Sequence, residues 1–260
     1  MKTIKIFILI PILAITIPAA LAFINIKPPV KNNTIASKGF AVVELFTSES
    51  CSSCPPADEL VARIQKEYIS QPVYILAFHV DYWNHLGWKD AFSSVDYTKR
   101  QQMYSQHLRA EVYTPQVVIN GKKAFVGSEE NTLRNAIKAG LQNPVSAQIT
   151  LSGLKAGPNK ATVHYRTEGN GKNSVLILAL VQRSAQTSVK AGENKGRSLS
   201  HVQIVRKLQN VALSNGKGGT ESIALPDGFN PQNWEVIGIL QNTATGEITG
   251  AAKEEFQAAG

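Results

Sequence analysis

The chain has 260 residues and a formal net charge of +8, with 27 Lys and Arg against 19 Asp and Glu. Its 43% apolar fraction is ordinary for a globular protein and excludes a disordered chain. The positive charge is modest for this length, and the sequence contains no arginine-rich helix and no basic stripe with interleaved aromatic residues. A nucleic-acid partner is therefore not expected.

The first 22 residues have the pattern of an export signal. Two lysines precede an uncharged, mostly apolar run over residues 6–24, and this run contains the small-x-small sequence Ala20-Leu21-Ala22 that signal peptidases accept. An uncleaved membrane anchor is the alternative, because about 20 apolar residues can just span a bilayer. We predict a signal peptide over residues 1–22 and a linker over 23–38. The expected location is periplasmic or secreted, with membrane contact only through an uncleaved signal.

From residue 40 to about 142, strand-like and helix-like segments alternate. The runs 41–46 and 73–80 are short, continuous and apolar, which is typical of strands buried on both faces of a sheet. Turn residues Asn120-Gly121 between two apolar runs predict a hairpin. The elements expected in chain order are a strand (41–46), a helix (56–69), a strand (73–80), a helix (94–107), a two-stranded hairpin (116–127) and a helix (129–141).

The two cysteines of the chain, Cys51 and Cys54, lie between the first predicted strand and the first predicted helix. Two thiols with this spacing can close a small disulfide ring, and unpaired N–H groups at a helix start favour a thiolate. Cys51 is the candidate nucleophile and Cys54 the candidate resolving thiol. A structural disulfide and a metal site are the alternatives. So short a ring stabilises the fold little, and the five histidines show no metal-binding spacing.

Several side chains of functional types follow the second predicted strand, in residues 79–90. Ligands approach an open α/β sheet at the carboxyl ends of its strands, so Asp81 and Trp83 are expected near the cysteines. There Asp81 would accept the proton of Cys54, and Trp83 would form a wall of the substrate site. The alternatives are structural: a turn cap for Asp81, and core positions for Trp83 and His79.

This order of elements, with the Cys-x-x-Cys sequence at the first strand-to-helix junction and Thr114-Pro115 before the third strand, resembles the thioredoxin fold. The resemblance implies that Pro115 follows a cis peptide bond and lies against the cysteines. It also implies that Thr114 offers backbone hydrogen bonds to a substrate. Ser50 replaces the usual aromatic residue before the first cysteine, and the spacer is Ser-Ser in place of Gly-Pro. These departures leave the direction of electron flow open.

Four segments carry a closer resemblance: Leu45 to Asp58, Val80-Asp81-Tyr82-Trp83, Thr114-Pro115-Gln116 and Gly192 to Arg197. With them the chain resembles the exported bacterial family known as domain of unknown function 1223. The resemblance spans nearly the whole mature chain and implies a thioredoxin-like fold without a settled activity.

After about residue 145 the composition changes to short runs with strand-like alternation, separated by Gly, Pro and Asn clusters. About 110 residues of this kind suffice for a β-sandwich core. The polar insert Lys190 to Ser200 is expected to be an exposed loop whose charged Glu193, Lys195 and Arg197 contact a partner or the cysteine site, or else a solvated hairpin tip. The expected strands are 146–152, 161–167, 174–183, 201–212, 219–224, 234–242 and 247–255.

We therefore expect an α/β thioredoxin-like domain over residues 39–144, followed by an all-β, sandwich-like domain over 145–260. The expected function is thiol-disulfide exchange on a protein or small-molecule thiol substrate, without a cofactor or a metal. The alternatives are a non-catalytic binding module with a fixed disulfide, and a copper(I) carrier. The predicted site residues are Cys51 and Cys54 for catalysis, and Thr114, Pro115, Asp81 and Trp83 for substrate binding.

Overall fold

The computed structural model describes residues 39–169, 173–213 and 218–257. The predicted signal peptide (1–22) and linker (23–38) lie outside these residues. No helix of the described ranges is long and apolar enough to cross a membrane.

The elements of the described residues, in chain order, are β1 (Ala41–Thr47), α1 (Pro55–Glu67), β2 (Val73–His79), the 3₁₀ helix η1 (Asn84–Leu86), α2 (Val95–Leu108), β3 (Gln116–Ile119), β4 (Lys123–Val126), α3 (Glu130–Gln142), β5 (Gln148–Ala156), β6 (Lys160–Glu168), β7 (Ser174–Ser188), β8 (Ser198–Ala212), β9 (Gly218–Ala224), the 3₁₀ helix η2 (Pro231–Asn233), β10 (Trp234–Asn242) and β11 (Ile248–Glu255).

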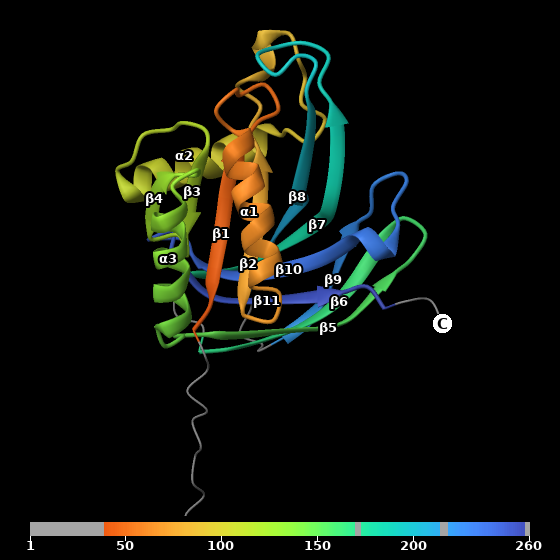
Figure 1. Ribbon diagram of the computed structural model, residues 1–260. Helices are drawn as coiled ribbons and strands as arrows, with labels where there is room; N and C mark the ends of the chain where they lie inside the picture. The colour runs from red at the N-terminus through yellow and green to blue at the C-terminus, as the bar shows by residue number, and fades with distance from the viewer. Residues whose placement is uncertain (1–38, 170–172, 214–217, 258–260) are drawn as a thin grey trace, which may run out of the picture. The chain divides into compact units, whose positions relative to one another are not determined.

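An eight-stranded mixed sheet is the framework of the described part of the chain (Figure 1). Its strand order is β11-β10-β7-β8-β2-β1-β3-β4. Strands β1 and β2 run parallel, while β3 and β4 continue the sheet antiparallel. On the other side β8, β7, β10 and β11 pair antiparallel. A parallel pairing of Ala77 in β2 with Ile204 in β8 joins the two groups.

The fold class predicted from the sequence is wrong. The described residues are mostly β, and strands from after residue 145 extend the sheet that β1 to β4 begin, so the protein is not a thioredoxin-like α/β domain followed by a β-sandwich. Strands β7 and β8 have 15 residues each, longer than the strands of most sheets, and β8 reaches the open edge of β2. An open edge presents unpaired backbone groups, and the pairing with β8 covers this one.

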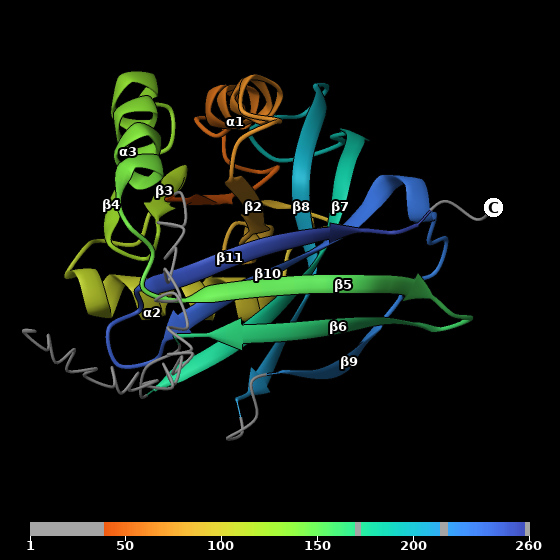
Figure 2. The same ribbon diagram turned by 90° about the horizontal axis from the view of Figure 1, so that it is seen from below.

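Helices cover both faces of the β1-β2 part of the sheet. Helices α1 and α3 pack on one face, where Leu60 and Leu133 contact the core residues Val43 and Leu45. Helix α2 packs on the opposite face, as Figure 2 shows. The second sheet, with the order β5-β6-β9, packs its apolar side chains on β7 and β10. The apolar faces of the helices and of the second sheet are thus buried against the two faces of the eight-stranded sheet.

A buried ionic network joins α2 to strands from both halves of the chain. Arg100 donates its Nε–H to the carboxylate of Glu44 in β1 at 2.7 Å, and Nη1 donates to Gln241 in β10 at 3.1 Å. The hydroxyl of Tyr104 donates to the same carboxylate of Glu44. Glu44 is fully buried and Arg100 nearly so. A charged pair at this depth requires both partners, because a single buried charge is strongly destabilising.

The predicted hairpin at Asn120-Gly121 is confirmed. Both residues have positive φ angles, 49° and 65°, as the two central residues of a tight hairpin turn require, and Lys122 completes the three-residue connection between β3 and β4. A Cβ atom on Gly121 would lie 2.0 Å from the backbone oxygen of Gly246, so this position admits only glycine. The side chain of Asn120 also accepts the N–H of Val42 at 2.6 Å, which ties the turn to β1.

Candidate functional site

The two cysteines form a disulfide where β1 leads into α1, with their Cα atoms 5.4 Å apart. Cys54 is the N-cap residue of α1, and Pro55 and Pro56 follow in the first turn, where a missing N–H leaves no intrahelical bond unmade. The hydroxyl of Ser53 lies 3.4 Å from Cys51 Sγ. Both cysteines are almost completely buried, with 1% of Cys51 and 0% of Cys54 exposed. In this disulfide form the sulfurs are therefore shielded from solvent.

The segment Val189–Arg197 between β7 and β8, here called the cap, covers the disulfide. Figure 1 shows this turn and the start of α1 at the same end of the structure. Asn194 donates Nδ2–H to the backbone oxygens of Glu49 and Cys51, both at 2.9 Å. The N–H of Ser52 donates to the Glu193 carboxylate at 2.9 Å. Of the three charged residues singled out in this insert, Glu193 contacts the cysteine loop, and Arg197 donates to Asn194.

Two buried carboxylates and one histidine lie beside the pair and form what we call the acid-histidine cluster: Glu49, Asp58 and His201. His201 is on β8, with Nε2 3.5 Å from Glu49 Oε1 and Nδ1 3.9 Å from Asp58 Oδ1. These are ion-pair distances without hydrogen-bond alignment. The other oxygens are fixed, because Trp88 donates to Glu49 at 2.7 Å and Thr47 donates to Asp58 at 3.1 Å. The cluster therefore holds two carboxylates around one imidazole.

The electrostatics of the cluster favour a charged His201. Burial lowers the pKa of His201, but Asp58 and Glu49 outweigh burial and raise it to about 9. His79 lies next to it, with the two ring centres 4.8 Å apart, and is bonded to the carboxylate of Asp90 at 2.7 Å. Burial alone would raise the pKa of Asp90, whereas the charge and hydrogen bond of His79 lower it. At neutral pH His201 is thus an imidazolium, with the side chains of Glu49 and Asp58 on either ring nitrogen.

Asp58 is the member of the cluster nearest the disulfide along α1. It lies one helical turn beyond Cys54, and its N–H donates to Cys54 O at 3.1 Å. Residues four apart on a helix share a face, with Cβ atoms about 5–6 Å apart. A cavity of about 170 Å³, lined by Pro55, Asp58 and residues 197–201, opens beside the same helix end. Asp58 and His201 thus line a space that is large enough to admit water.

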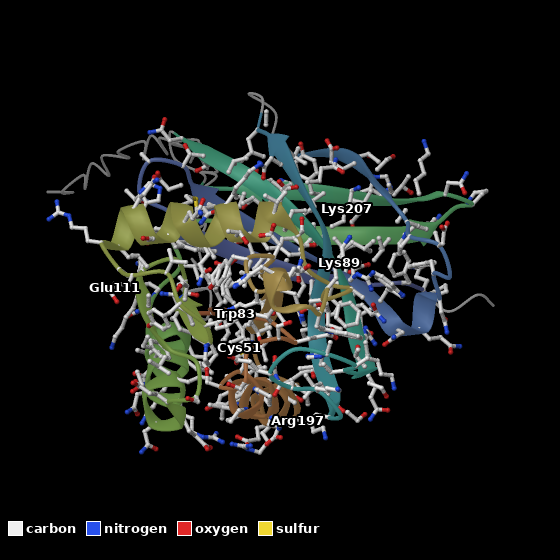
Figure 3. All side chains as sticks on the ribbon, turned by 90° about the horizontal axis from the view of Figure 1, so that it is seen from above. Cys51, Trp83, Lys89, Glu111, Arg197 and Lys207 are labelled. Carbon is white, nitrogen blue, oxygen red and sulfur yellow. A yellow bond between two sulfur atoms is a disulfide. The ribbon has the colours of Figure 1, made fainter. Side chains whose placement is uncertain are left out.

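The structure brings two of the predicted substrate-binding residues together. Trp83 donates its indole N–H to Thr114 Oγ1 at 2.7 Å. The cis Thr114-Pro115 bond implied by the resemblance is confirmed. Pro115 lies close to Gly127, since a Cβ there would be 3.2 Å from both Pro115 Cβ and Ala57 Cβ in α1. In the view from above, Cys51 lies between Trp83 and the cap residue Arg197 (Figure 3).

Asp81 is bound to α2. Its backbone N–H donates to Thr98 Oγ1 at 3.2 Å, and its carboxylate accepts from the same hydroxyl at 2.5 Å. The side chain therefore has a structural partner in a helix, which differs from the turn cap considered for this residue. The expected core position of His79 is also found, because the residue is fully buried and bonded to Asp90. Asp58, and not Asp81, is the carboxylate that shares a helix face with Cys54.

Sequence reasoning missed the role of Glu49, Asp58, His201 and Asn194. Nothing local marks the two carboxylates as buried, although both lie within the segment that carries the family resemblance. For His201 a signal exists, because alternation along β8 places it on the same face as the buried Leu199. A histidine at an inward position of a strand requires a polar partner.

The described residues contain no group of three or more His, Cys, Asp or Glu side chains placed to hold a metal ion. The cysteine pair is adjoined by the Ser53 hydroxyl, and the side-chain amide of the cap residue Asn194 donates to the backbone oxygen of Cys51.

The comparisons with known proteins give a family and a fold. The family model described as "Protein of unknown function (DUF1223)" matches residues 42–241. A crystal structure of a protein from Agrobacterium tumefaciens is similar at a TM-score of 0.63 and 29% identity, covering 85% of this chain and 97% of that chain. The structure of HBP35 of Porphyromonas gingivalis has a TM-score of 0.61 at 18% identity, covering 85% and 76%, and this likeness concerns the fold alone. No curated protein matches the chain.

Proposed function

The chain belongs to the DUF1223 family of proteins of unknown function, and for its cysteine pair we propose thiol-disulfide exchange. The observation that carries the proposal is the position of the pair: Cys51 and Cys54 are joined at the start of α1, beside a buried carboxylate that shares a helix face with Cys54. The positive end of a helix stabilises a thiolate, and an adjacent acid-histidine cluster can take up or return a proton.

In the reductase direction the reduced protein carries a Cys51 thiolate and a Cys54 thiol. The thiolate attacks one sulfur of a substrate disulfide, so that a bond from Cys51 to the substrate forms, the substrate S–S bond breaks and one substrate thiolate leaves. Cys54 then loses its proton and attacks Cys51 Sγ, which releases the second substrate thiolate. The substrate gains two electrons and the protein dithiol becomes the disulfide. The oxidase direction runs the same steps in reverse.

Asp58 is the proposed acceptor of the Cys54 proton. The residue is 6% exposed, lies one turn from Cys54 and is oriented by Thr47 Oγ1. His201 acts through Asp58 as a positioning residue, because its Nδ1 lies 3.9 Å from Asp58 Oδ1 and its positive charge attracts the carboxylate. The cavity beside residues 197–201 then lets the proton pass to water. Both groups serve the reverse step, in which Cys54 leaves as a thiolate and is protonated.

We assign substrate binding to the surface formed by Trp83 and Thr114. The hydrogen bond of 2.7 Å between their side chains fixes the indole next to the segment that leads into β3. A fixed aromatic face offers a large contact area at little cost in conformational entropy. The proposal includes export, because a disulfide persists in the oxidising periplasm or outside the cell, and is reduced in the cytosol.

A fixed, non-catalytic disulfide in a binding module is the second candidate. The observation that favours it is the burial of both sulfurs under the cap. A disulfide that no thiol can reach serves stability alone. Exchange therefore requires that the cap moves, and this requirement separates the two candidates.

Trapping of mixed disulfides tests the proposal. In Cys54→Ser the resolving thiol is absent, so we expect mixed disulfides between Cys51 and substrate proteins on non-reducing gels, while the matched Cys51→Ser variant forms none. The reduced wild-type protein should also reduce a small model disulfide. If Cys54→Ser stays monomeric and the wild-type protein exchanges with no model disulfide, the fixed disulfide is the correct assignment.

A further inference from the structure

The cap, Val189–Arg197, does more than cover the disulfide: we infer that it is an autoinhibitory segment, closed over the oxidised pair and released when the pair is reduced. This inference rests on the proposed function. Its contacts involve the same backbone groups that flank the reactive sulfur, namely the N–H of Ser52 and the oxygens of Glu49 and Cys51. A substrate cannot approach Cys51 while those groups are occupied, since 1% of the residue is exposed.

Asn194 is the central contact of the closed cap. The residue is 1% exposed, and its amide bridges two carbonyl oxygens that are buried beneath it. Arg197 donates Nη1–H to Asn194 Oδ1 at 3.0 Å, which leaves the amide nitrogen directed at those oxygens. The Cys51 oxygen also accepts the N–H of Cys54 at 3.2 Å, so the Asn194 amide matters most for the oxygen of the buried Glu49. A buried backbone oxygen without a donor is unfavourable, and this contact therefore stabilises the closed cap.

Hydrogen bonds within the cap hold its own backbone together independently of the cysteine loop. Its two ends are held together by hydrogen bonds between Val189 and Arg197 and between Gly196 and Val189, both at 2.9 Å. Gly192, at the tip, has a φ angle of 75°, and a Cβ there would lie 3.4 Å from Trp88 Cβ and 3.5 Å from Ser50 Oγ. The internal bonds do not involve the cysteine loop, so they remain when the contacts to the loop break.

The charges at the start of α1 couple the cap to the redox state. The hydroxyl and the backbone N–H of Ser52 lower the pKa of Glu193, which is thus a carboxylate at neutral pH. In the oxidised protein Glu193 is the anion bound at this helix end, where an anion is favourable. Reduction by an external dithiol breaks the Cys51–Cys54 bond, transfers two electrons to the two sulfurs, oxidises the dithiol to a disulfide, and leaves a Cys51 thiolate and a Cys54 thiol.

The reduced state therefore places two anions at one helix end. A thiolate on Cys51 and the carboxylate of Glu193, which is bound to the next residue, repel each other and compete for the same positive potential. The closed cap is destabilised in the reduced state and not in the oxidised state. As a result the closed cap slows non-specific reduction of the disulfide in the oxidised protein, whereas in the reduced protein the open cap lets a substrate disulfide reach Cys51. A coupling of the ordinary size shifts the closed-to-open ratio by about 5- to 150-fold.

Hydrogen exchange of the cap, measured by mass spectrometry in the oxidised and the reduced protein, tests the inference without requiring any exchange activity. The N–H of Ser52 is hydrogen-bonded to the cap in the closed form, whereas the N–H of Gly196 is bonded within the cap and stays bonded when the cap opens. We expect exchange at Ser52 to be at least about fivefold faster after reduction, while exchange at Gly196 stays unchanged. In Glu193→Gln, which keeps an acceptor and loses the charge, the difference between redox states should shrink.

The exposed Glu111, which lies apart from Cys51 in Figure 3, supplies the matched control. Glu111→Gln removes the same charge and should leave the redox difference as in wild type. Equal protection of the Ser52 N–H in both redox states would overturn the inference, and this comparison needs no variant. If hydrogen exchange differs between the redox states but the protein exchanges with no disulfide, the opening of the cap is supported and the proposed function is rejected. If the protein exchanges disulfides but hydrogen exchange is the same in both redox states, the proposed function is supported and the opening of the cap is rejected.

Discussion

Replacing His201 by glutamine is expected to remove a large pH dependence from the stability of the protein. Asp58 and Glu49 outweigh the effect of burial and raise the pKa of His201 from 6.5 to about 9. A change of that size corresponds to about 3 kcal/mol of unfolding free energy. Because the folded pKa lies above the unfolded one, this stabilisation is complete below about pH 6.5 and is lost as the pH rises through about 9.

Equilibrium denaturation of the oxidised protein between about pH 6 and 10 measures this slope, since the disulfide-bonded cysteines do not titrate. The wild-type protein should lose about 3 kcal/mol across the window, and His201→Gln should lose almost none while being less stable at pH 6. The exposed His85 provides the control, because His85→Gln should keep the wild-type slope. Asp58→Asn should show a reduced slope. A wild-type stability that is flat across the window, or an equal slope in His201→Gln, would refute the assignment of the imidazolium.

Three further substitutions test the fold and the substrate surface. Arg100→Leu should cost about 3–5 kcal/mol in urea denaturation, because Glu44 is left buried without its partner, and a cost below about 1 kcal/mol would contradict the buried network. Gly121→Ala should lower the melting temperature by several degrees, since it adds a Cβ at a positive φ against a backbone oxygen, and an unchanged value would contradict the turn geometry. Trp83→Phe removes the hydrogen bond to Thr114 and should slow exchange with protein disulfides more than with a small disulfide, and equal slowing would remove the tryptophan from the substrate surface.

The elements of this fold could be read from the sequence, but their assembly could not. Periodicity depends on neighbouring residues, so the runs 41–46 and 73–80 gave strands close to the observed ends. A distant strand joins a sheet edge through backbone N–H and C=O groups. These groups are the same for nearly every residue type, so the side-chain pattern does not show which edge the strand will join. The pairing of Ala77 with Ile204 that joins the two groups of strands has no local signal. The error in fold class arose at that step.

For the candidate site, the sequence identified the groups that act locally. The spacing of Cys51 and Cys54, their place before a helix and the charged insert near Glu193 were all visible as short patterns. His201 and Asn194 were not, because each meets its partners only after β8 has paired with the sheet. A residue whose role is to neutralise buried carboxylates from another element can be recognised only when the elements are placed.

The pairing of β8 with β2 has a consequence for the chemistry of the cysteines. Strand β8 supplies His201 to the buried carboxylates and begins directly after the cap, so both additions to the site come from adjacent segments of the second half. Without this strand Glu49 and Asp58 would share a buried space with no histidine beside them, which is unfavourable for two acidic side chains. The second half of the chain is therefore part of the proposed proton path and of the cap, and the residues before position 145 do not form a complete exchange site by themselves.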